Sequence, residues 1–434
     1  MTTSVTENRS GPRLNDPGEL RRVVSEVVGA APVFDMHTHL YAPEFGDLGL
    51  SGIDELLTYH YLVAETFRSA AVTYEEFWRM PKPAQADLVW RTLFVERAPV
   101  SEAARGVVTV LDAFGLDTSA ADLNEARDFF REQDPAEHLG RVLGLAGVSD
   151  VVMTNDPFDG QEARVWEGNV EMDGRFHAAL RMDGLLNDWA GTSAELAARG
   201  YEVDEGLSGR TAGEVRRFLD VWIERMRPLY MAVSLPDDFD HPAEDARDRL
   251  IRDVVIPTAL SHGVAFALMV GVRRGVNPAL RAAGDGVGRA RVDAVERLCA
   301  ENPGVRFLST FLSRENQHEL CVSARKFSNL MPFGCWWFLN NPSIIKEITT
   351  ERIELLGTSF VAQHSDARIL EQLIYKWRHS RRVVAEALSE SYTRLFESGR
   401  GVTRVEIERD AARLFDQNFR RWVSHAPPAE PRSN

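Results

Sequence analysis

Eight short apolar runs, separated by segments with helical spacing, constrain most strongly what this 434-residue chain can fold into. The runs have the length of β-strands and are rich in Val, Leu and Phe, which suits strands buried on both faces of a parallel sheet. The segments between them supply the crossover helices that parallel strands need. The runs lie at residues 33–36, 148–154, 176–182, 229–235, 264–270, 306–312, 330–335 and 359–363.

Eight strands that alternate with helices predict an α/β fold of the (β/α)8 type, a TIM barrel. An open, doubly wound sheet would show the same alternation, but the count of eight and the polar residues at several strand ends favour the barrel. We expect the barrel to span residues 15–424, between flexible termini at 1–14, which is polar, and 425–434, which is rich in proline.

One connection is much longer than the others. About 110 residues separate the first two strands, and a structureless loop of that length is implausible. Amphipathic segments within it predict a helical insertion at about 50–145 that roofs the mouth of the barrel. Residues 186–228 form a second, shorter excursion.

Composition excludes several classes of partner. The net charge of -15 argues against binding to nucleic acid or to an anionic membrane, because both need clustered Lys and Arg. No apolar stretch approaches the roughly 20 residues of a membrane span, and the N-terminus lacks the apolar segment of a signal peptide. Three widely spaced cysteines form no disulfide framework, so we expect a cytoplasmic protein whose partner is a small molecule.

The first strand ends in a histidine pair, His37-Thr38-His39. Side chains at i and i+2 of a strand point to the same face, so both imidazoles can bind one divalent cation. In a barrel, the residues that follow each strand converge on one pocket. The pair therefore predicts a metal site at the carboxyl end of the first strand, although His-x-His can also arise by chance on an exposed edge strand.

A carboxylate after the last strand is the natural third ligand. Asp366 fits this role, and it can also accept a proton from a bound hydroxyl or water. An N-cap role for Ser365 or Asp366 is the structural alternative. His364 is the competing ligand at this strand end.

Other polar and aromatic residues are placed to hold an anionic substrate. Arg181 and Arg368, after the third and eighth strands, can grip a carboxylate in forked geometry, although ion pairing with local acids is the simpler explanation for most arginines here. Trp336 and Trp337 can stack on the C–H face of a sugar or belong to the core. His60 lies at the start of the inserted helices, where a lid residue would be.

These residues fall in motifs that are similar to those of a known family. The chain resembles the uronate isomerases (glucuronate isomerases) of the amidohydrolase superfamily, and most closely a divergent bacterial subgroup with Thr-Tyr-His-Tyr and His-Ser-Asp-Ala-Arg motifs. The matching motifs run across nearly the whole chain: Phe34-Asp-Met-His-Thr-His, Leu57-Thr-Tyr-His-Tyr-Leu-Val-Ala-Glu, Val152-Met-Thr-Asn-Asp-Pro-Phe-Asp, Arg181-Met-Asp, Phe333-Gly-Cys-Trp-Trp-Phe and His364-Ser-Asp-Ala-Arg.

The resemblance implies a metal-dependent barrel with one divalent ion, for which zinc is expected. The better-known branch carries a histidine on the fifth strand, where this chain has Met269. Without that histidine the usual two-metal arrangement of the superfamily is ruled out, and the remaining ligands are His37, His39 and Asp366.

The resemblance also implies a reaction: D-glucuronate to D-fructuronate and D-galacturonate to D-tagaturonate, by proton transfer from C2 to C1 through a metal-stabilised enediol. Arg181 and Arg368 would hold the C6 carboxylate of the hexuronate. His60 would open the ring and move hydroxyl protons, and Tyr61 would abstract the C2 proton once a nearby cation or arginine lowers its pKa, with Asp366 the first substitute. No organic cofactor is needed, and a homo-oligomer is left open.

Two other functions remain in view. A metal-dependent hydrolase or decarboxylase of the amidohydrolase superfamily, acting on a carboxylated small molecule, could use the same barrel. A catalytically silent carbohydrate-binding protein is disfavoured by the metal and arginine residues that are present. The arginine pair and the two tryptophans favour a sugar acid and hence the isomerase.

Overall fold

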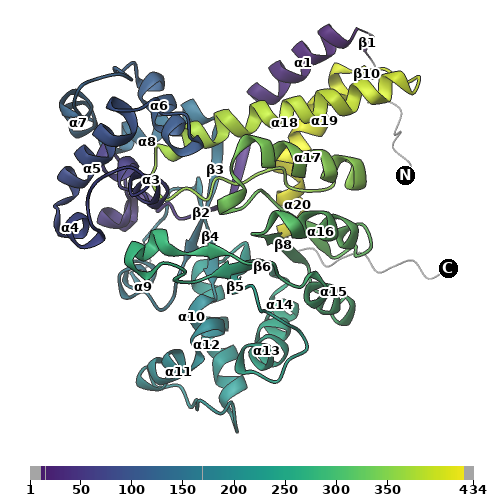
Figure 1. The fold of residues 1–434 in the computed structure, drawn as a ribbon. Helices are drawn as coiled ribbons and strands as arrows, with labels where there is room; N and C mark the ends of the chain where they lie inside the picture. Colours follow the sequence, from purple (N-terminus) through teal and green to yellow (C-terminus); the bar gives the residue numbers. More distant parts are fainter. Residues whose placement is uncertain (1–10, 15, 169, 425–434) are drawn as a thin grey trace.

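The computed structural model describes residues 11–14, 16–168 and 170–424. At its centre is a curled sheet of seven parallel strands that neighbour one another in chain order (Figure 1). Seven of the eight predicted strands are therefore confirmed. They are β2 (Val33–Thr38), β3 (Val148–Asn155), β4 (Phe176–Arg181), β5 (Tyr230–Pro236), β6 (Ala265–Arg273), β8 (Phe307–Phe311) and β9 (Leu330–Pro332).

The eighth predicted strand, residues 359–363, is wrong: only Val361 pairs, in a single parallel bridge with Phe333. The side chain of Gln363 accepts the backbone N–H of Cys335, so a side chain takes the place of a regular ladder here. A few residues further on, the backbone N–H of Asp366 donates to the carbonyl of His37 at 3.1 Å. The segment therefore lies between β9 and β2 and is joined to both.

The chain between β2 and β3 is helical. Local signals set several boundaries: Thr73 and Glu76 form a capping box at the start of α4, Ser101 caps α6, and Gly147 ends α8 at a φ of 63°. The segments are η2 (Pro43–Leu48), α2 (Ile53–Leu57), α3 (His60–Thr66), α4 (Tyr74–Arg79), α5 (Lys82–Trp90), η3 (Arg91–Val95), α6 (Glu102–Phe114), α7 (Asn124–Arg131) and α8 (Pro135–Ala146).

The remaining helices cover the sheet and its ends. Figure 1 shows α18 running past the sheet towards the helices that lie between β2 and β3, and it packs against α1, α6, α8 and α17. The helices outside the segment between β2 and β3 are α1 (Pro17–Ala30), α9 (Gly160–Glu167), α10 (Asp183–Asn187), α11 (Trp189–Ala198), α12 (Thr211–Met226), α13 (Ala246–Leu250), η4 (Ile251–Val255), α14 (Ile256–His262), η5 (Pro278–Gly284), α15 (Val292–Glu301), η6 (Arg314–Asn316), α16 (Gln317–Ala324), η7 (Trp337–Leu339), α17 (Pro342–Leu356), α18 (Gln372–Glu397), α19 (Arg404–Ala412), η8 (Arg413–Gln417) and α20 (Asn418–Val423).

Two short strand pairs lie outside the parallel ladder. β1 (Arg13–Leu14) pairs with β10 (Val402–Thr403), and β7 (Gly286–Val287) pairs with the end of β6. We predicted a flexible N-terminus over residues 1–14, but Arg13 and Leu14 belong to the paired strand β1. Residues 1–10 and 425–434 lie outside the described part of the chain. Among the described helices, none is both long enough and apolar enough to cross a lipid bilayer.

Candidate metal centre and active site

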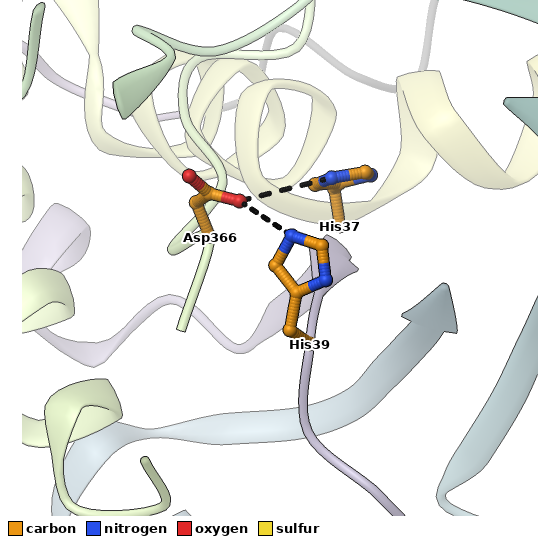
Figure 2. Close-up of side chains that lie close together, drawn as sticks. All are labelled: His37, His39 and Asp366. Carbon is orange, nitrogen blue, oxygen red and sulfur yellow. Dashed lines mark ion pairs between the residues drawn. The ribbon is translucent and has the colours of Figure 1, made fainter. Parts of the chain in front are cut away.

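The two histidines leave the end of β2 on the same side, as Figure 2 shows. His37 is buried and His39 is one quarter exposed, at 24% of its side chain. Asp366 reaches them because the loop after residue 361 is bonded to the end of β2: the backbone N–H of His39 donates to Ala367 at 2.7 Å. The side chain of Asp35 in β2 also accepts the backbone N–H of Ser365 at 3.0 Å, which ties the loop to β2 at a second point.

The three side chains form a group of metal-binding type. Oδ1 of Asp366 lies 3.8 Å from Nε2 of His37 and 3.4 Å from Nε2 of His39, and one ligand atom from each residue lies within 4.8 Å of the other two. Within the described chain, the buried Nε2 of His37 and Oδ1 of Asp366 have no hydrogen-bond partner. Two imidazoles and one carboxylate, with ligand atoms this close, fit a divalent cation.

Hydrogen bonds fix which nitrogen of each ring is free. Tyr230 Oη donates to the carbonyl of Met36 at 2.6 Å and lies 3.0 Å from Nδ1 of His37, so it accepts the proton of that nitrogen. Thr154 Oγ1 does the same for His39, because it donates to the carbonyl of Thr38 and lies 2.9 Å from Nδ1 of His39. Both Nε2 atoms therefore carry a free lone pair directed at Asp366.

The charges agree with this assignment. Burial lowers the pKa of His37 well below its ordinary value and also lowers the pKa of His39. Burial alone would raise the pKa of Asp366, but a hydrogen bond from His39 and the charges that His39, His37 and Lys376 carry when protonated hold that pKa well below its ordinary range, so Asp366 stays ionised. Neutral imidazoles beside an ionised carboxylate are the protonation states in which these groups bind a metal.

His364, the competing ligand, does not join the group. It is fully buried and its ring centre lies 5.5 Å from that of His37, but its nitrogens are not among the clustered ligand atoms. Gly334 makes room for it: a Cβ there would lie 1.8 Å from Nδ1 of His364. Among the described residues, the clustered ligand atoms are therefore those of His37, His39 and Asp366, and the three-ligand assignment stays a prediction.

A cavity of about 170 Å³, here called the metal cavity, opens above these residues. Besides the three ligand residues, it is lined by five predicted site residues: His60, Arg181, Trp336, Trp337 and Arg368. The cavity therefore brings together residues that lie more than 300 positions apart in the sequence.

The two arginines differ in how they are held. Arg181 donates to Asp183 at 3.1 Å; burial alone would lower its pKa, but the charge of Asp183 and its neighbours raises it. Arg368 faces the metal cavity and has no ion pair among the described residues. Arg368 is therefore the freer cation for an incoming carboxylate.

The structure separates the two residues predicted for proton transfer. His60 lines the metal cavity, and burial lowers its pKa to about 3. Tyr61 instead lines a neighbouring cavity of about 190 Å³, here called the second cavity, and its hydroxyl donates weakly to the carbonyl of Trp337 at 3.5 Å. Burial raises the pKa of Tyr61 well above its ordinary value, which is opposite to the lowering that we expected.

Trp337 forms a wall of both cavities. Its ring centre lies 5.8 Å from that of His60, and its ring stacks on Phe338. Trp337 and Asp366 both have a left-handed φ, 47° and 51°, which side chains other than glycine rarely adopt. Strain of this kind gathers at functional sites, where the surrounding fold holds a residue in one orientation.

Several residues of the site were not found from the sequence. Tyr59 lines the metal cavity beside His60, and Arg274 and Asp285 form an ion pair at its rim. Tyr59 lies within the quoted Thr-Tyr-His-Tyr motif, so that motif could have pointed to it. Tyr230 gave no signal, because its role depends on how β5 lies relative to β2 across the sheet.

The fold and site define the class: an α/β enzyme whose active site lies at the carboxyl ends of parallel strands and can hold a metal ion. No protein-family model and no curated protein matches the chain. Among solved structures, a uronate isomerase from Bacillus halodurans C-125 is 54% identical, with a TM-score of 0.93 over 94% of this chain and 97% of that one. The chain belongs to the uronate isomerase family.

More distant structures share the fold. A uronate isomerase from Thermotoga maritima is 14% identical, with a TM-score of 0.77 over 95% of this chain and 100% of that one. A glucuronate isomerase from Caulobacter crescentus is 17% identical, with a TM-score of 0.69 over 97% of each chain.

Proposed function

We propose that the protein catalyses the aldose–ketose isomerisation of hexuronates, D-glucuronate to D-fructuronate and D-galacturonate to D-tagaturonate. The observation that carries the proposal is the metal cavity, in which the three ligand residues and two arginines face one space of about 170 Å³. Family membership at 54% identity supports the same reaction.

The substrate carboxylate is bound by Arg368 and Arg181. Arg368 supplies the unpaired guanidinium, and Arg181, held in place by Asp183, supplies the second. Forked, charge-assisted hydrogen bonds from two guanidinium groups fix both the position and the orientation of C6. Trp336 and Trp337 close the other side and offer flat faces for sugar C–H groups.

His37, His39 and Asp366 hold one divalent ion, and zinc suits two neutral imidazoles and one carboxylate. When bound, the ion supplies Lewis-acid polarisation of a carbonyl oxygen. Tyr230 and Thr154 keep both ring nitrogens Nε2 deprotonated, so the ligands need no rearrangement on binding.

We assign the proton transfers to His60, which lines the metal cavity, and to Tyr61, which lines the adjoining second cavity. His60, whose lowered pKa keeps it neutral, accepts a hydroxyl proton during ring opening and returns it. Tyr61, as its phenolate, takes up the C2 proton and leaves an enediolate, and the resulting phenol delivers that proton to C1. The weak 3.5 Å hydrogen bond of Tyr61 to Trp337 leaves its hydroxyl free to turn towards a bound sugar, because catalytic contacts tighten when substrate binds. Asp366 is the next candidate for this base.

One experiment tests the function. Metal-replete protein is incubated with D-glucuronate or D-galacturonate in deuterated water, and the ketose and the C2 proton are followed by NMR. We expect both ketoses to form, Tyr61→Phe to stop the loss of the C2 proton, and His60→Asn to slow turnover of the cyclic sugar. Release of carbon dioxide or hydrolysis, without ketose, would contradict the isomerase.

Three further proposals concern the fold, the cellular location and the oligomeric state. The curled sheet, with its bridging eighth segment, is a (β/α)8 barrel in which the helices between β2 and β3 are an insertion. Three free, buried cysteines agree with a reducing, cytoplasmic location. A homo-oligomer stays a prediction.

A further inference from the structure

Lys376 is a buried cation without a direct partner. It lies in α18, is only 6% exposed, and within the described chain its Nζ has no hydrogen-bond partner. By contrast, Lys82 and Lys346 lie at the surface, where they pair with Glu55 and Glu390. A buried, unpaired ammonium group is costly, so its presence calls for a functional explanation.

The acids around Lys376 are already engaged. Burial lowers the pKa of Lys376, and three carboxylates oppose that lowering: Asp366, Asp35 and Glu102. Asp35 accepts from Ser365 and from the indole of Trp377 at 2.8 Å, and Glu102 lies 2.6 Å from Nδ1 of His379. Asp366 belongs to the metal ligands. Within the described chain, no side chain therefore bonds the ammonium group of Lys376 directly.

That charge lies next to Tyr61. Nζ of Lys376 is 5.8 Å from the centre of the Tyr61 ring, and both residues line the second cavity. Burial is the main reason why the pKa of Tyr61 is raised, and Tyr59, Asp366 and Tyr375 raise it further. Lys376 is the nearby group whose charge favours a phenolate, since opposite charges attract strongly in a buried site.

We infer that Lys376 is a positioning residue for the isomerisation: its ammonium group provides the positive charge that allows Tyr61 to give up and regain a proton within an apolar enclosure. This inference rests on the proposed function, in which Tyr61 carries the C2 proton. The charge of Lys376 also lowers the pKa of Asp366 and of His60, so its effect extends to the metal cavity.

The test compares Lys376→Met with the wild type and with Lys346→Met, a matched control at the surface of α17. In Lys376→Met we expect kcat with D-glucuronate to fall about 10- to 100-fold, as for the loss of one charge near the reacting group. KM and metal content should stay within about threefold, and the pH at which kcat is half-maximal should move upward as the Tyr61 phenol becomes harder to ionise. Lys346→Met should match the wild type.

Stability separates this role from a structural one. Removing an unpaired buried charge should leave the melting temperature unchanged or raise it, whereas a structural lysine would lower it. If Lys376→Met does not fold, Lys376→Gln is measured in its place. A normal kcat in the folded variant, or full activity of Tyr61→Phe, overturns the inference about Lys376. The proposed function is judged separately, by whether the wild type produces the ketose.

Discussion

At the scale of single residues, the metal centre depends on hydrogen bonds one step away from the ligands. The hydroxyls of Tyr230 and Thr154 each donate to a backbone carbonyl of β2. Each hydroxyl must therefore accept the proton of a histidine Nδ1. The His-x-His spacing and the convergence of strand ends were enough to predict that His37, His39 and Asp366 lie together. The supporting hydroxyls could not be predicted, because they come from neighbouring strands whose register the sequence pattern does not specify.

Tyr230→Phe should therefore weaken metal binding without removing a ligand. The change deletes the acceptor for Nδ1–H of His37 and lets the ring rotate or change tautomer, which should lower metal affinity about 10- to 100-fold. Competition with a chelator of known affinity measures the effect. Tyr392→Phe is the control, since that buried phenol bonds Asp410 instead. Equal metal affinity in both variants would mean that the hydrogen bond of Tyr230 to His37 does not support metal binding.

Arg368→Met should separate substrate binding from metal binding. Arg368 is the unpaired cation of the metal cavity, so its loss should lower kcat/KM for D-glucuronate by about 2–5 kcal/mol of transition-state binding, while metal content stays unchanged. Arg394→Met, which breaks only an exposed pair with Glu354, should be neutral. Comparable turnover of neutral hexoses by the wild type would show that no carboxylate grip exists.

At the scale of elements, strands were easier to predict than the segment that completes the site. Seven apolar runs became strands because each is bonded to a parallel neighbour along its length. Residues 359–363 also hold a short apolar run, but side-chain bonds such as that of Gln363 replace the ladder. This departure carries the chain towards Asp366 and its strained φ of 51°. The exception to the pattern is therefore part of the active site.

Packing between α6 and α18 gives a prediction at this scale. Gly106 of α6 lies against the ring of Tyr375 of α18, where an added Cβ would come within 2.7 Å. Gly106→Ala should destabilise the protein by about 1–3 kcal/mol, despite the better helix propensity of alanine. Gly140→Ala, on an exposed face of α8 with open space around it, should stabilise by about 0.5–1 kcal/mol. Urea unfolding gives the change in the free energy of unfolding for each variant. A stabilising effect of both substitutions would mean that α6 can shift away from α18.

At the scale of the whole molecule, buried ionisable groups make stability depend on pH. Burial lowers the pKa of His60 to about 3 and that of His364 to about 4, below the ordinary value of 6.5. The unfolded chain therefore binds protons below pH 6.5 that the folded chain does not, and stability falls as the pH falls towards 4. Asp35 acts in the opposite direction, because burial raises its pKa to about 6 and the folded form binds its proton first.

Burial also raises the pKa of Asp156, Glu162 and Glu351, which act with Asp35, and lowers the pKa of His37 and His39, which act with His60 and His364. The downward shifts of the histidines are the larger ones and decide the sign. In chelator-treated protein we expect the free energy of unfolding to decrease by about 2–4 kcal/mol between pH 6.5 and 4.5, as measured by urea unfolding at each pH. His60→Asn should reduce this loss, because it removes one group that must stay neutral in the folded state. A bound divalent ion should add stability at pH 6.5 and progressively less towards pH 4.5, where protons compete for the same imidazoles. A free energy of unfolding that stays constant or rises on acidification would mean that these histidines take up protons without unfolding.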